Sequence, residues 1–192
     1  VGFSDDGVDV GHFQGYESIA FDGDFVYLTI EAGTDIEMKS YFISGQIQDG
    51  TIQIDTSSIT EIQQPHDIGN SAHESIIVTQ TGVPITIYER NRPTEDIEES
   101  TATMILQNNL EEISFPAVPY RVTDATEMDL DNNFHVINYL FPGENSRIED
   151  YKFKDYLTGT HAKLPQIESI IELHYDASRN EITWLDQPPI LL

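Results

Sequence analysis

Three acidic residues, Glu17, Glu74 and Asp124, stand at matching places in three similar stretches of the chain. Each precedes a short apolar strand, a tight turn and a second apolar strand. Carboxylates that converge repel one another, so one keeps its proton unless a cation lies among them. The pattern therefore predicts a metal site for Ca²⁺ or Mg²⁺, which prefer oxygen ligands. The alternative is that each acid caps its own turn by accepting backbone N–H groups.

A second set of polar residues, Glu31, Glu89 and Asn138, ends the second strand of each stretch. They form a second polar ring if the stretches converge, and otherwise they are solvated strand ends. His73 lies beside Glu74 and is the histidine best placed to act as a catalytic general base.

Two predicted loops, residues 90–96 and 141–165, carry many of the few cations of the chain. Both loops are expected to overhang the place where the three acidic residues converge. A metal and an anionic group could then bind there together. The residues predicted to contact an anionic ligand or ester substrate are Arg90, Arg92, Asn138, Arg147 and His161. The alternative is that the cations only balance an acidic surface.

The three stretches recur at a spacing of roughly 50 residues, which indicates a repeat architecture. Residues 16–63, 74–115 and 124–185 each contain four segments with the alternation typical of antiparallel strands. The prediction is an all-β chain, a β-propeller of four-stranded antiparallel blades. Propellers usually have four to eight blades, so three blades and a trailing strand at 187–192 predict part of a larger ring. A missing N-terminal part or a second chain would close that ring.

The composition excludes several function classes. With 34 acidic residues against 9 Lys and Arg, the net charge is −25, which repels nucleic acid and anionic membranes. Solubility in salty surroundings is another explanation for this charge. There is no cysteine, so disulfides and thiolate chemistry are excluded. No stretch approaches the roughly 20 apolar residues of a membrane span, and no Gly-rich phosphate loop or Gly-x-Ser-x-Gly elbow occurs.

Two runs resemble a known family. The run 17–20, Glu-Ser-Ile-Ala, followed by Asp-Gly-Asp-Phe-Val-Tyr-Leu at 22–28, resembles the signature of the esterase-like β-propeller family related to bacterial phytases. The runs 123–126, 134–139 and 141–143 resemble secreted or lipoprotein members of that group. The resemblance implies an extracytoplasmic protein (periplasmic, outer-membrane lipoprotein or secreted), a propeller about twice this size, Ca²⁺ binding and phosphoesterase activity.

Two functions follow from these expectations. The first is a metal-dependent phosphoesterase or esterase-like hydrolase acting at the channel mouth. In it Glu17, Glu74 and Asp124 hold the cation, and His73 or a metal-bound water supplies the attack. The alternative is a non-catalytic propeller that binds a glycan, a small anion or a protein through its loop face.

Overall fold

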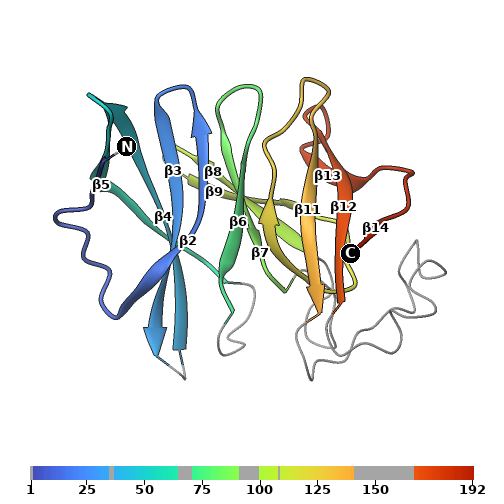
Figure 1. The fold of residues 1–192 in the computed structure, drawn as a ribbon, viewed down its shortest axis with the longest axis horizontal. Helices are drawn as coiled ribbons and strands as arrows, with labels where there is room; N and C mark the ends of the chain where they lie inside the picture. The colour runs from blue at the N-terminus through green and yellow to red at the C-terminus, as the bar shows by residue number, and fades with distance from the viewer. Residues whose placement is uncertain (1, 35–36, 65–70, 91–99, 108, 141–166) are drawn as a thin grey trace.

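The computed structural model describes residues 2–34, 37–64, 71–90, 100–107, 109–140 and 167–192, and every regular element within them is a β-strand (Figure 1). The predicted all-β class is confirmed. Most of the described strands form three successive antiparallel meanders of four strands each, called here the first, second and third units. The meanders run from Phe13 to Ile62, from His73 to Ser114 and from Arg121 to Trp184, so each begins one to three residues before the predicted ranges 16–63, 74–115 and 124–185.

The first unit consists of β2 (Phe13–Asp22), β3 (Phe25–Thr34), β4 (Glu37–Gln48) and β5 (Thr51–Ile62). Its strands are rich in β-branched and aromatic residues, which fit a pleated, half-buried surface. Gly23, at φ 60°, forms the tight turn between β2 and β3, because glycine adopts this left-handed conformation without steric cost. A short strand, β1 (Gly2–Ser4), pairs in parallel with β5.

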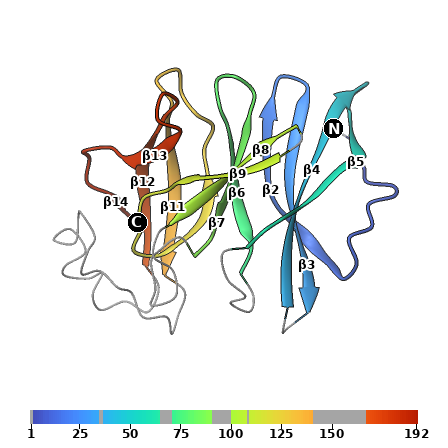
Figure 2. The same cartoon turned by 180° about the vertical axis from the view of Figure 1, so that it is seen from behind.

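The second and third units repeat this order of strands. The second consists of β6 (His73–Val78), β7 (Pro84–Tyr88), β8 (Thr101–Leu106) and β9 (Asn109–Ser114). The third consists of β10 (Arg121–Ala125), β11 (Asn133–Leu140), β12 (Ile167–Asp176) and β13 (Glu181–Trp184). The outer strands β9 and β13 of these two units touch through one parallel pair, Ser114 with Glu181 (Figure 2).

The first strands of the units lie side by side, β2 next to β6 and β6 next to β10. The turns that follow these three strands all point the same way, toward the top of Figure 1. Equivalent residues of successive units are therefore brought near one another at the inner strands.

The faces between neighbouring units carry the core. Between the first and second units lies a cluster formed by Ala20, Phe42, Ile62, Ile76 and Ile105. A larger cluster joins the second and third units and includes Ile77, Ile87, Phe134, Val136 and Leu173. Because strands alternate their side chains, one face of each strand of the second unit packs against the unit before it and the other face against the unit after it.

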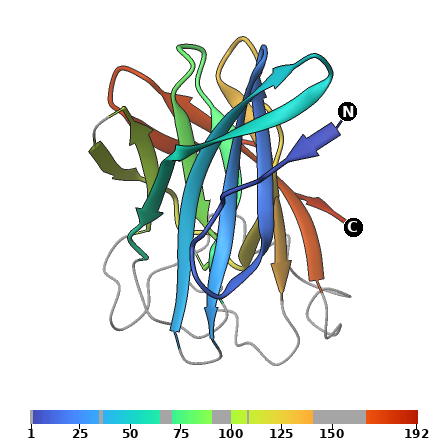
Figure 3. The ribbon, with the colours of Figure 1, turned by 90° about the vertical axis from the view of Figure 1, so that its left-hand side faces the viewer.

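The outer face of the first unit is covered by the N-terminal segment, as the view in Figure 3 shows. Val8 and Val10 of this segment pack against a buried cluster that includes Leu28, Ile30 and Ile43. The segment then turns back and enters β2.

The C-terminal end corrects one expectation. Residues 187–192 were expected to pair outside the three units, but β14 (Ile190–Leu191) pairs with β12 of the third unit, opposite Ser169 and Ile170. The exposed edge of β12 accepts it because β13 pairs only with the later part of that strand.

No helix in the described ranges is both long enough and apolar enough to cross a membrane.

Candidate functional site

Each inner strand contains a β-bulge near its beginning. The pairing of β2 with β3 skips Glu17, that of β6 with β7 skips Glu74, and that of β10 with β11 skips Thr123. A bulge inserts an unpaired residue and turns its side chain out of the regular alternation. Glu17, Glu74 and Thr123 are therefore the structurally equivalent residues.

This corrects the predicted alignment of Asp124, which lies one position beyond the bulge. It is equivalent to Ser18 and Ser75, the residues that follow the bulge in the other units. Its carboxylate is exposed and accepts the N–H of Ala125 at 2.8 Å. This local bond is the capping role that the sequence offered as the alternative.

Four glutamates of the first two units come together at the bulged ends of the inner strands. This glutamate cluster is defined as Glu17 on β2, Glu31 on β3, Glu74 on β6 and Glu89 immediately after β7. Glu17 is exposed, Glu31 and Glu74 are half-buried, and Glu89 is only 1% exposed. Two members of each predicted polar ring thus form one cluster that runs from the surface into the interior, and Asp124 and Asn138 are not part of it.

Two members of the cluster, Glu31 and Glu74, bind protons more tightly than isolated carboxyl groups do. Burial, followed by the charges of Glu17 and Glu89, raises the pKa of Glu31 to about 7. Burial, followed by Glu89 and Glu17, raises the pKa of Glu74 to about 8, although Arg121 acts in the opposite direction. Near neutral pH, part of the cluster is therefore protonated, because unneutralised carboxylates repel one another in a partly buried place.

Glu89 has a structural role as well. Its Oε2 accepts a hydrogen bond from Arg121 Nη1 at 2.6 Å, and its Oε1 accepts the N–H of Ala72 at 3.1 Å. Its backbone carbonyl accepts the N–H of Val122 at 2.8 Å. Glu89 thus connects the second unit to the first strand of the third.

Asn138 was predicted to contact a ligand, but it lies in the interior. It is fully buried, and its Nδ2 donates to the carbonyls of Tyr120 at 2.6 Å and Arg121 at 3.0 Å. It pairs with Val122, whereas Tyr139, the next residue, pairs with Arg121 and is the one equivalent to Glu31. Asn138 therefore holds the start of β10 in place.

His73 also lies in the core, with 2% of its surface exposed. Its ring packs against Tyr88, with centroids 5.5 Å apart, and its backbone N–H donates to Ser40 Oγ of the first unit. Burial lowers the pKa of its imidazole to about 3, so the ring is neutral at physiological pH. Its surroundings give it a packing role between two units, and its predicted role as a general base has no support from them.

Of the predicted ligand-binding cations, Arg90 is half-buried directly after Glu89. Arg92, Arg147 and His161 lie outside the described residues, as do most of the two predicted loops. The described residues contain no group of three or more His, Asp and Glu side chains at metal-binding geometry. The donor chemistry of the glutamate cluster, all carboxylate oxygens, suits a hard cation such as Ca²⁺.

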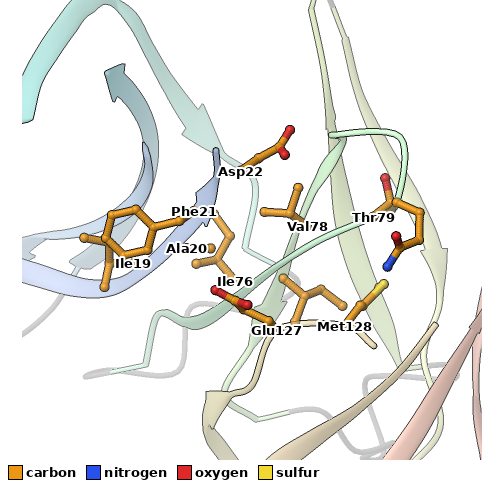
Figure 4. Close-up of a pocket in the computed structure, with 11 residues that line it drawn as sticks. Ile19, Ala20, Phe21, Asp22, Ile76, Val78, Thr79, Glu127 and Met128 are labelled. Carbon is orange, nitrogen blue, oxygen red and sulfur yellow. The ribbon is translucent and has the colours of Figure 1, made fainter. Parts of the chain in front are cut away.

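A pocket lies at the opposite ends of the same inner strands (Figure 4). Its volume is about 210 Å³, and its walls are formed by β2, β6 and the connection that follows β10. Ala20, Ile76 and Val78 lie between two carboxylates, Asp22 and Glu127. Sequence reasoning missed this pocket because its wall residues look like ordinary apolar strand residues, and nothing in their spacing indicates a cavity.

Comparisons with known proteins leave the family open. No protein-family model matches the chain, and no significant match was found among curated proteins.

Proposed function

We propose that the three units are blades of a β-propeller whose inner strands β2, β6 and β10 face its axis. Three observations support this: the four-stranded meanders follow one another, their first strands are adjacent, and apolar clusters fill the spaces between them. Propellers usually have at least four blades. The ring would therefore be completed by further sheets, from another part of a longer chain or from a second chain.

The function we infer is cation-dependent ligand binding at the glutamate cluster. This inference rests on the proximity of four glutamates from two units. Among the described residues, Arg121 is the cationic side chain that forms an ion pair with one of them. Arg121 is engaged by Glu89, the most buried member. In the part of the chain that the structure describes, none of the other three carboxyl groups has an ion pair, so protons or an external cation would neutralise them.

Glu17, Glu31 and Glu74 are the residues that would hold Ca²⁺. Exposed Glu17 already shares a side-chain hydrogen bond with half-buried Glu31, and carboxylate oxygens are the ligands that Ca²⁺ prefers. A bound Ca²⁺ would supply a positive centre for an anionic ligand such as a phosphate or carboxylate group. An extracytoplasmic location fits this proposal, because extracellular modules bind Ca²⁺ at roughly 10⁻⁴–10⁻³ M.

A calcium titration followed by thermal unfolding tests this function. At pH 8.5 the cluster is mostly ionised, and Ca²⁺ should raise Tm more than NaCl of equal ionic strength does, because a ligand of the folded state stabilises by mass action. At 100 times its Kd the gain is about 2.7 kcal/mol. At pH 6 protons compete with Ca²⁺, so the gain should shrink.

Glu74→Gln should abolish most of the calcium-specific gain, and Asp124→Asn should leave it unchanged because Asp124 already caps its own turn. Equal shifts with Ca²⁺ and with matched NaCl, at both pH values, would rule out the cation site.

A hydrolase at the same place is the second candidate. The observation that favours it is the pKa of Glu31, about 7, which suits a general acid or base at neutral pH. We would expect calcium-dependent hydrolysis of p-nitrophenyl phosphate or p-nitrophenyl acetate, with a loss of about 10²-fold or more in Glu31→Gln. Hydrolysis that survives this substitution, or its complete absence in the wild type, would exclude Glu31 as a catalytic residue.

A further inference from the structure

A groove of about 620 Å³ lies between the first and second units, on the side of β3, β4 and β5 that faces β7 and β8. This volume falls within the roughly 300–1,000 Å³ of small-molecule sites. The lining combines aromatic rings, hydroxyl groups and aliphatic side chains, and none of the described residues that form it is acidic or basic. In a chain in which 22% of the residues are charged, an uncharged groove of this size stands apart from the rest of the surface.

The aromatic part of the lining comes from neighbouring strands. Phe25 and Tyr27 are two residues apart on β3 and so stand on the same face of the strand. Tyr27 stacks on buried Phe42, with ring centroids 5.9 Å apart, which fixes its orientation. Phe25 is 48% exposed and presents its ring to a ligand.

The hydroxyl groups of β5 are already oriented by local hydrogen bonds. Ser57 Oγ donates to Asp55 Oδ1 at 2.6 Å, Ser58 Oγ donates to the Asp55 carbonyl at 2.7 Å, and Thr60 Oγ1 donates to the Ser58 carbonyl at 3.1 Å. Ser58 Oγ also accepts the Ser44 N–H at 2.8 Å, so it has one lone pair left, and the oxygens of Ser57 and Thr60 can accept hydrogen bonds from a ligand. The nearby Asp55 carboxylate also accepts the Ser57 N–H at 3.0 Å. Its negative charge is therefore stabilised by two hydrogen bonds from Ser57, within the same strand.

We propose that this groove binds a neutral saccharide. A sugar ring offers an apolar face for stacking on Phe25 and hydroxyl donors for the oxygens of β5, and it carries no charge that the acidic chain would repel or attract. An anionic ligand would meet neither a basic side chain nor a cation in this lining. The inference does not depend on the proposed cation site, which lies at the bulged ends of the inner strands.

Calorimetric titration with maltohexaose, cellohexaose and mannohexaose, and with an anionic oligogalacturonate for comparison, tests the proposal. We expect saturable binding of at least one neutral oligosaccharide, little change in its Kd with salt, and no binding of the oligogalacturonate. Phe25→Ala should weaken binding about tenfold through loss of ring stacking, and Phe25→Tyr should retain it.

Phe13→Ala is the matched control, because Phe13 is also 48% exposed but lies outside the groove. It should bind like the wild type. The proposal is overturned if none of the three neutral oligosaccharides binds saturably, if Phe25→Ala and Phe13→Ala have the same effect, or if the oligogalacturonate binds as tightly as the neutral sugars.

Discussion

The first two units and the third share one backbone feature and differ in the residue placed on it. All three inner strands have a bulge at the same position, but the bulged residue is Glu17 in the first unit, Glu74 in the second and Thr123 in the third. Since the bulge forms with either residue type, it belongs to the architecture of the unit. The acids are an addition that only two of the units carry.

The third unit contributes the opposite charge. Arg121 lies two residues before the bulged residue of its strand. The equivalent residue is Gly15 in the first unit and Ala72 in the second. Its guanidinium reaches Glu89 of the second unit. The two partners of this contact come from positions that face each other within a unit, because Ala72, the equivalent of Arg121, lies opposite Glu89.

The largest effect is expected from removing Arg121. Arg121→Met leaves Glu89, which is 1% exposed, as an uncompensated buried charge, and this should cost about 3–5 kcal/mol. In a chain of this size Tm should fall by more than about 6 °C. Thermal unfolding of the variant beside the wild type measures it.

The exposed pair of Lys39 and Glu61 is the matched control for this prediction. Its partners are 3.1 Å apart but 40% and 53% exposed, so Lys39→Met should lower Tm much less than Arg121→Met does. The double variant Glu89→Gln with Arg121→Met should recover much of the loss, because the amide still accepts the Ala72 N–H. If Arg121→Met and Lys39→Met lower Tm equally, the buried pair does not hold the units together.

The second prediction is that stability falls as the pH rises through the raised pKa values of the cluster. Glu31 and Glu74 have ordinary values of 4.5 and folded-state values of about 7 and about 8. The folded state therefore retains protons that the unfolded state has released, and this advantage is complete below pH 4.5 and gone above about pH 8. Glu74→Gln should raise Tm at pH 9 by about 2–4 °C, which corresponds to about 1 kcal/mol, and by less at pH 5.

His73 acts in the other direction on the acid side. Burial lowers its pKa from 6.5 to about 3, so its contribution to stability is present above pH 6.5 and is lost as the pH falls. Comparing the wild type with Glu74→Gln at each pH removes this shared contribution. A difference between the two proteins that stays constant from pH 5 to pH 9 would contradict the assignment to Glu74.

The smallest effect is expected from giving the third unit the acid that it lacks. Thr123→Glu places a carboxylate at the bulge, two residues from Arg121. Above pH 7 it should lower the free energy of unfolding by less than about 1 kcal/mol, so Tm should fall more steeply with pH than in the wild type. Asp124→Glu, one position later, should leave the pH profile unchanged because that side chain is exposed and faces its own turn. Identical profiles for the two variants would show that the bulge does not direct residues toward the cluster.

The meanders could be predicted from the sequence because alternation and turn residues are local signals. In the first unit, for example, the run 25–30 and the Asp-Gly-Asp turn predict the β2–β3 hairpin directly. The alignment of the third unit could not be predicted in the same way, since Thr123 and Asp124 are adjacent and the position of the bulge decides which of them matches Glu17. Simple matching of acid with acid chose Asp124.

How deeply the candidate site residues are buried also could not be predicted from the sequence. His73 and Glu74 are neighbours in the sequence, yet one is a core residue and the other is half-buried in the cluster. The difference arises from the bulge and from Ser40 of the first unit, which is 33 residues away and binds the His73 backbone. Likewise, no local signal connects Glu89 to Arg121, which lies 32 residues further along the chain.

The N-terminal segment makes the two ends of the row of units different, because it packs on the first unit. Val8 and Val10 cover part of the outer face of the first unit, and β1 pairs with its edge strand β5, so a sheet that completes the ring on this side must pack on this segment or displace it. Head-to-tail growth, in which the third unit of one molecule stacks on the first unit of the next, meets the same obstacle. Such unclosed contacts produce filaments, and we expect the N-terminal segment to disfavour this kind of growth.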